Sequence, residues 1–154
     1  MSNKIKNRLA ELGISLPQLA APVANYVPAV ISGSMLYISG QLPMKDGQMI
    51  KGHLGKDVSI EQGQEAARTC ALNIITQASA ALNGDLDRVV RCVKLGGFVS
   101  STPDFTDHPK VVNGASDFIV NVFGDAGRHA RAAVGVAALP LGAAVEVEAV
   151  FEIR

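Results

Sequence analysis

The amino-acid sequence predicts an α+β fold in which two long helices cover one face of a single β-sheet. Strand-like runs occur in pairs near both ends of the chain, and two segments with helical apolar spacing lie between them. After a leading helix the predicted order is β-β-α-β-α-β-β, which is typical of one sheet with its helices on one side. No repeat or linker divides the 154 residues, so we expect one domain over residues 1–154.

A short helix is predicted at the start of the chain, and we treat residues 1–13 as an N-terminal helical extension. The apolar residues Ile5, Leu9 and Leu12 recur at near-helical spacing, and Gly13 is a typical helix stop. The apolar stripe is narrow. We therefore expect this helix to pack on the outside of the domain.

Two strands are predicted after an irregular connector. Residues 26–31 and 35–39 are strand-like and flank Ser32-Gly33-Ser34, which is a hairpin signal. Lys45-Asp46-Gly47 predicts a further turn. A third strand is predicted over residues 88–100, where the adjacent Gly96 and Gly97 suggest a β-bulge.

The two long helices have recognisable ends. The first is expected to begin at Ser59, with Gln62 completing a capping box, and to end near Asn83-Gly84. Pro109 suits the first turn of the second helix, and Gly124 ends it. The apolar residues of the first helix are mostly small, which allows a close approach to the sheet.

The last twenty-four residues contain the most informative pattern. Residues 145–153 alternate apolar side chains with glutamates, and the connector Leu139–Gly142 favours a reversal of the chain. If the flanking runs pair as a hairpin, Arg131 shares a face with Glu146 and Glu148. A guanidinium beside carboxylates and small residues would suit a small carboxylate ligand. The alternative is an edge strand with solvated charges.

Composition and charge argue against several classes of protein. Lys+Arg and Asp+Glu both number 14, and this balance argues against a nucleic-acid-binding protein. The N-terminus lacks the apolar core of a signal peptide and no segment has the length of a membrane span, so we expect a cytoplasmic protein without membrane partners. Cys70 and Cys92 lie among apolar residues and are expected to be buried thiols.

Familiar catalytic motifs are mostly missing. The chain has no P-loop, no G-x-G-x-x-G after a strand and no G-x-S-x-G elbow. His53, His108 and His129 have no partners at metal-ligand spacing, so we predict ordinary surface histidines and no metal site. The sheet face opposite the helices carries few large residues, and we expect other subunits to bury it.

The sequence resembles the reactive intermediate deaminase family, which is YjgF-like and is also known as endoribonuclease L-PSP. The resemblance covers roughly residues 20–154, and the chain is similar to a longer subgroup. The matching stretches are Ala21-Pro22 to Tyr26-Val27, Ile38 to Pro43, Val112-Asn113, Arg131, Leu139-Pro140 and Val145 to Ala149. The S-G-Q-[IL]-P segment and the R-x8-P-x5-E-x-E-A pattern are specific mainly in combination.

The resemblance implies a chorismate-mutase-like fold that assembles as a homotrimer, with sites in the clefts between subunits. It also implies hydrolysis of enamine or imine intermediates, such as 2-aminoacrylate, to a 2-oxo acid and ammonia. No metal or organic cofactor is implied. The implied ligand is therefore a small 2-imino or 2-oxo carboxylate.

The resemblance also implies roles for individual residues. Arg131 matches the arginine that binds the substrate carboxylate, and Glu146 matches the acidic residue that acts on the attacking water. Tyr26, Gly40 and Asn113 match pocket-lining residues. Ala133 occupies a pocket position that is often Cys in the family, and it is expected to act through its backbone.

Three other functions remain open at the level of sequence. The first is a non-catalytic protein that binds small organic acids. The second is a ribonuclease, against which the neutral net charge and the lack of a basic-aromatic stripe argue. The third is a mutase-like isomerase that shares the fold.

Overall fold

The computed structural model describes residues 3–19 and 25–154. Apart from the small β3–β4 hairpin, the described elements follow the predicted order. They are α1 (Lys4–Glu11), β1 (Ala29–Ser32), β2 (Met35–Gln41), β3 (Met44–Lys45), β4 (Gln48–Met49), α2 (Ile60–Ala81), β5 (Val89–Ser100), α3 (His108–Phe123), β6 (Ala130–Val136) and β7 (Val145–Ile153), with 3₁₀ turns at Leu86–Arg88, Gly124–Gly127 and Pro140–Gly142.

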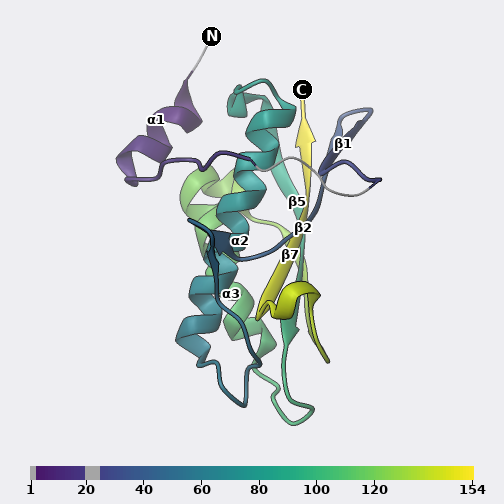
Figure 1. Ribbon diagram of the computed structural model, residues 1–154. Helices are drawn as coiled ribbons and strands as arrows, with labels where there is room; N and C mark the ends of the chain where they lie inside the picture. The colour runs from purple at the N-terminus through teal and green to yellow at the C-terminus, as the bar shows by residue number, and fades with distance from the viewer. Residues whose placement is uncertain (1–2, 20–24) are drawn as a thin grey trace.

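One five-stranded sheet, in the order β1-β2-β7-β5-β6, forms the centre of the fold. Its neighbouring strands are antiparallel except β5 and β6, which are parallel and joined through α3. Helices α2 and α3 lie side by side on one face of this sheet (Figure 1). The predicted α+β class, with two helices on one face, is confirmed.

The core lies between the two helices and the sheet. Strand β7 alternates buried and more exposed residues along its whole length, and the Phe151 side chain is completely buried. The two helices approach closely because Gly114 of α3 lies against the backbone of Gln64 in α2; an added Cβ would collide with the Gln64 carbonyl oxygen. The small apolar residues that were predicted to face the sheet are buried along α2, and the close contact between the two helices at Gly114 is an additional feature.

The ends of both long helices match their sequence signals. The Ser59 hydroxyl accepts from the Gln62 amide, and the Gln62 side chain accepts from the Ser59 amide, which completes the predicted capping box. Pro109 stands in the first turn of α3. That helix ends at Gly124, whose φ of 65° suits glycine.

The predicted terminal hairpin is wrong. The chain does reverse around Pro140–Gly142, but β6 and β7 are not neighbours, because β5 lies between them and pairs with both. Strand β7 is central and β6 is the edge strand. The difference follows from side-chain size, since β6 offers mainly Ala and Gly and cannot fill a central position.

The predicted bulge at Gly96–Gly97 is also wrong. The register of β5 against β7 shifts earlier, between Val89 and Arg91 and between Cys92 and Lys94. The two glycines provide room instead. A Cβ on Gly97 would lie 2.6 Å from the Val112 methyl groups, and one on Gly96 would lie 2.9 Å from the Glu148 side chain.

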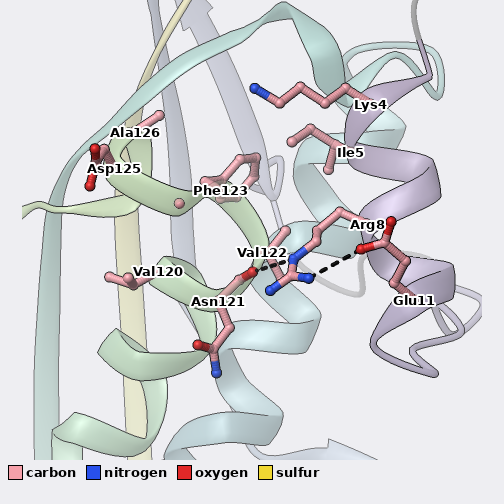
Figure 2. A pocket seen from close by; sticks show the side chains of 11 residues that line it. Lys4, Ile5, Arg8, Glu11, Val120, Asn121, Val122, Phe123, Asp125 and Ala126 are labelled. Carbon is pink, nitrogen blue, oxygen red and sulfur yellow. Dashed lines mark hydrogen bonds and ion pairs between the residues drawn. The ribbon is translucent and has the colours of Figure 1, made fainter.

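The N-terminal helix packs on the outside of the domain, as predicted. Ile5 and Leu9 are buried, and the Asp87 carboxylate accepts from the amides of Lys4 and Ile5 at 2.9 and 2.8 Å. From α1, Arg8 donates to the Asn121 carbonyl oxygen at 2.9 Å (Figure 2). A cavity of about 670 Å³ lies along this contact between α1 and the end of α3, and none of the predicted site residues lines it.

The first strand is shorter than predicted. It begins at Ala29, and residues 26–28 precede it without strand structure. Ala21 and Pro22, at the start of the resemblance, lie outside the described residues.

The sheet face opposite the helices is not covered by any described element. Cross-strand partners Val30 and Tyr37 lie on this face with about half of each side chain exposed, and Val134 of β6 is 46% exposed there. In Figure 1 the two long helices occupy only the other side. We name this surface the open face.

Candidate functional site

The predicted site residues form two groups on opposite faces of the sheet. Strand β5 shows on which face each group lies, because it pairs with both strands. Its Leu95 pairs with Arg131 of β6, and its Phe98 pairs with Glu146 of β7. Leu95 is buried beneath the helices, and a residue three positions along a regular strand points the other way. The Arg131 side chain therefore lies on the helix side, and Glu146 lies on the open face. The prediction that Arg131 and Glu146 share one face of the sheet is therefore wrong for a single chain.

The first group surrounds Arg131 between β6 and α3. Its Nη1 donates to Asn113 Oδ1 at 2.8 Å and to Ser116 Oγ at 3.1 Å. Asn113 and Ser116 are three residues apart on α3 and so present their side chains on the same side of the helix. Within residues 3–19 and 25–154, no carboxylate forms an ion pair with Arg131. The cation is therefore held in place without a counter-ion from the described part of the chain.

Ser116 links Arg131 to His129. The Ser116 hydroxyl lies 2.9 Å from His129 Nε2, and His129 Nδ1 lies 2.6 Å from the carbonyl oxygen of Gly127. Burial and the charge of Arg131 lower the pKa of His129, although the bond to Gly127 opposes this shift. Sequence reasoning missed both residues. The signal available was their spacing, since Ser116 follows Asn113 by one helical turn and His129 precedes Arg131 by two residues.

The second group lies on the open face around Glu146. An added Cβ on Gly40 of β2 would collide with the Glu146 carboxylate, so the glycine leaves the space that this side chain occupies. Burial, followed by the charge of Glu148, raises the pKa of Glu146. A half-buried carboxylate with a raised pKa suits proton transfer near neutral pH better than an ordinary surface glutamate does.

Tyr26 and Ala133 complete the predicted set. Tyr26 precedes β1 at the open end of the β1–β2 pair, the end where Gly40 lies, and its side chain is 59% exposed. Ala133 pairs with Gly97 on the helix side and packs against the core. The structure therefore places Asn113, Ala133 and Arg131 on one side and Gly40 and Glu146 on the other.

The expectation of three ordinary surface histidines is wrong, because all three are partly buried and hydrogen bonded. His53 Nε2 lies 2.8 Å from the Ala137 carbonyl oxygen, and His108 Nε2 lies 3.0 Å from Ser101 Oγ. The part of the chain that the structure describes contains no group of three or more His, Cys, Asp or Glu side chains that could hold a metal ion.

Both cysteines are buried free thiols, as predicted. Burial raises the pKa of Cys70 well above its usual value and raises that of Cys92 to about 12. Neither thiol is therefore a nucleophile near neutral pH.

Among the described residues, no helix is both long enough and apolar enough to cross a membrane.

Known proteins resemble this chain over nearly its full length. A family model described as "YjgF/chorismate_mutase-like, putative endoribonuclease" matches residues 6–153. Protein TCP17 of Trypanosoma cruzi is 55% identical over 99% of this chain and 96% of its own length. A 2-iminobutanoate/2-iminopropanoate deaminase of Dermatophagoides farinae is 30% identical over 92% of this chain and 95% of its own.

Solved structures share the fold. The crystal structure of Atu1372 from Agrobacterium tumefaciens, described as a protein with unknown function, has a TM-score of 0.91 and 52% sequence identity. The match covers 99% of this chain and 94% of that one. This chain therefore belongs to the YjgF/chorismate-mutase-like family.

Proposed function

We propose that the protein hydrolyses 2-imino acids and their enamine tautomers, such as 2-aminoacrylate, to 2-oxo acids and ammonia. Arg131 is the observation on which this proposal depends. Its Nη1 is held by Asn113 and Ser116, while no described carboxylate neutralises its charge. A fixed, unneutralised guanidinium suits the carboxylate that all 2-imino acids share.

Glu146 supplies the proton transfers in this proposal. Water adds to the carbon of the protonated C=N bond as one water proton passes to the Glu146 carboxylate, giving a neutral tetrahedral carbinolamine. The carboxyl group then returns this proton to nitrogen. As the C–N bond breaks, the C=O bond forms and the hydroxyl proton passes to Glu146, from which it leaves with ammonia as ammonium. Each turnover consumes one water and releases one ammonia. The raised pKa of Glu146 supports both steps, because its carboxyl group holds a proton more readily than that of an ordinary glutamate does.

The two halves of this site come from different subunits. Arg131 and Glu146 lie on opposite faces of one sheet, so a ligand that touches both requires Glu146 from one chain and Arg131 from another. The open face, with Val30, Tyr37 and Val134 exposed on it, provides a surface for that association. We propose the homotrimer that the family resemblance implies.

The names of the relatives support the reaction to different degrees. The Dermatophagoides farinae protein and a Capra hircus protein, 31% identical over 89% of this chain, are both named 2-iminobutanoate/2-iminopropanoate deaminase. The name TCP17, at 55% identity, specifies no reaction. The reaction therefore needs a direct test.

An amino-acid oxidase can generate 2-imino acids in situ, and the test measures their accelerated conversion to 2-oxo acid and ammonia. We expect wild type to accelerate this step and Arg131→Ala and Glu146→Ala to abolish the acceleration. Arg128→Ala and Glu152→Gln are matched controls, since Arg128 is an exposed arginine close in sequence and Glu152 follows Glu146 on the same strand face. Light scattering establishes that each variant assembles as wild type does.

A lack of acceleration across small and bulky amino acids would contradict the proposal. Binding of 2-oxo acids without turnover would then favour the organic-acid-binding alternative. Cleavage of RNA that depends on Arg131 would favour a ribonuclease.

A further inference from the structure

We propose that Ser116 and His129 are positioning residues for Arg131, with a histidine of fixed tautomer orienting the guanidinium through the serine hydroxyl. The inference rests on the proposed role of Arg131 as the group that binds the substrate carboxylate. It adds to that role a chain of hydrogen bonds that runs from Gly127 to Asn113.

The direction of each hydrogen bond follows from the groups involved. A backbone carbonyl oxygen only accepts, so His129 Nδ1, 2.6 Å from the Gly127 oxygen, must carry a proton. In the neutral imidazole Nε2 is then an acceptor. The Ser116 hydroxyl, 2.9 Å away, donates to it.

The Ser116 hydroxyl oxygen is thereby oriented to accept a hydrogen bond from Arg131. Its hydrogen points at His129, and its lone pairs accept from Arg131 Nη1 at 3.1 Å. Asn113 Oδ1 accepts from the same nitrogen at 2.8 Å. Two acceptors use both hydrogens of Nη1 and fix the guanidinium plane, while Nε and Nη2 remain for other acceptors.

The segment that holds His129 is itself fixed against α3. The 3₁₀ turn Gly124–Gly127 follows that helix directly, and a Cβ on Gly127 would lie 2.6 Å from the Ile119 carbonyl oxygen. Gly127 is therefore pressed against the backbone of α3, the helix that also carries Ser116. Packing of this kind keeps the Gly127 oxygen in place as the first acceptor.

Burial, and then the charge of Arg131 on β6, lowers the pKa of His129 and so favours its neutral form, although the bond to Gly127 opposes this shift. Other charged groups near this turn include Arg91 of β5, which donates to the Arg128 carbonyl oxygen, and the exposed Arg128–Asp125 pair. The pockets beside the turn are also lined by the charged residues Lys4, Arg8, Glu11, Asp87 and Arg154. A carboxylate bound to Arg131 would offset its charge, and so would raise the pKa of His129.

The first experiment compares Ser116→Ala with Ser116→Thr in the imine hydrolysis assay. The alanine removes the hydroxyl, and we expect KM to rise by about tenfold, with kcat nearly unchanged, because an oriented charge-assisted hydrogen bond is lost. The threonine keeps the hydroxyl and should restore KM. An unchanged KM in Ser116→Ala would overturn the proposal.

The second experiment needs no turnover. NMR of labelled histidine should show His129 protonated at Nδ1 in the free protein, and its pKa should rise when 2-oxobutanoate binds. The Arg131 Nε signal should sharpen in wild type relative to Ser116→Ala as the guanidinium becomes fixed. Protonation at Nε2, or an Arg131 signal indifferent to Ser116, would refute the relay. A protein that neither turns over imines nor binds 2-oxobutanoate would instead refute the proposed function, and the tautomer would still decide the relay.

Discussion

Arg131 and Glu146 both lie on strands that pair with β5, yet their side chains leave the sheet on opposite faces. A site that uses both residues therefore needs two chains. This relationship makes the proposed assembly testable through mixed oligomers, because each chain would contribute only half of each proposed site.

We predict that inactive Arg131→Ala and Glu146→Ala proteins regain activity when they are mixed. In a mixed oligomer some interfaces join the intact Arg131 of one chain to the intact Glu146 of another. Random mixing in equal amounts should restore about one quarter of the sites of a closed ring. The measurement is imine hydrolysis after unfolding and refolding the two proteins together, compared with each refolded alone. Mixtures that stay inactive while co-assembling would exclude a shared site.

The terminal hairpin shows why the sequence predicted the elements better than their pairing. The Pro140–Gly142 turn signalled a reversal, which occurs, but a local turn does not determine which strands become neighbours. The pairing follows from side-chain volume. Strand β7 offers Val145, Val147, Phe151 and Ile153 to the core, so it is central, whereas β6 is at the edge.

The candidate site could also be predicted only in part, because the face on which each residue lies depends on which strands are neighbours. The resemblance supplied Arg131, Glu146, Gly40 and Asn113. The structure places Arg131 beside Asn113 on the helix side of the sheet and Gly40 beside Glu146 on the open face. The face of each residue depended on strand order, which periodicity alone does not contain. His129 lacked a metal-ligand spacing and so appeared uninformative, although its partner is a serine thirteen residues away.

We predict that Glu146→Gln stabilises the protein at neutral pH while abolishing imine hydrolysis. Folding raises the pKa of Glu146 above its ordinary value of 4.5, so the folded state binds the proton more tightly than the unfolded state does. Its contribution to stability is complete below that value and is lost as the pH rises through the raised pKa. Glutamine has no charge to bury. Its Tm should exceed that of wild type by roughly 2 °C at pH 7.

The control for this prediction is the pH dependence of the difference. The Tm advantage of Glu146→Gln should shrink as the pH falls toward 4.5, because wild-type Glu146 then becomes protonated. An advantage of constant size across this range would mean that burial of the charge is not its cause.

Gly40→Ala is expected to lower kcat by at least about tenfold with little effect on stability. The added methyl group collides with the end of the Glu146 side chain, which is flexible and can swing aside. The glutamate is then displaced from its proposed catalytic position, and misplaced groups lose much of their effect. Gly96→Ala is the matched control on the same face, because its methyl group crowds Glu148 instead. Equal loss of activity in both variants would indicate a general disturbance of the open face.

Gly114→Ala is expected to destabilise the fold although it improves helix propensity. Replacing a helical glycine by alanine gains about 1 kcal/mol of helix stability. Here the methyl group would collide with the Gln64 carbonyl oxygen of α2, and backbone atoms cannot turn aside as a side chain can. Overpacking of this kind costs about 3 kcal/mol, so the clash should exceed the gain.

Gly63→Ala of α2 provides the matched comparison for that helix contact. Its methyl group would lie 3.0 Å from a Val111 methyl carbon and 3.2 Å from a Leu54 methyl carbon, both of which are side-chain atoms that can shift by a few tenths of an ångström. The helix-propensity gain should offset most of that cost. Chemical denaturation should therefore rank Gly114→Ala as clearly less stable than Gly63→Ala. The reverse order would mean that the α2–α3 contact can relax, and that glycine at this crossing is not required for the close approach of the two helices.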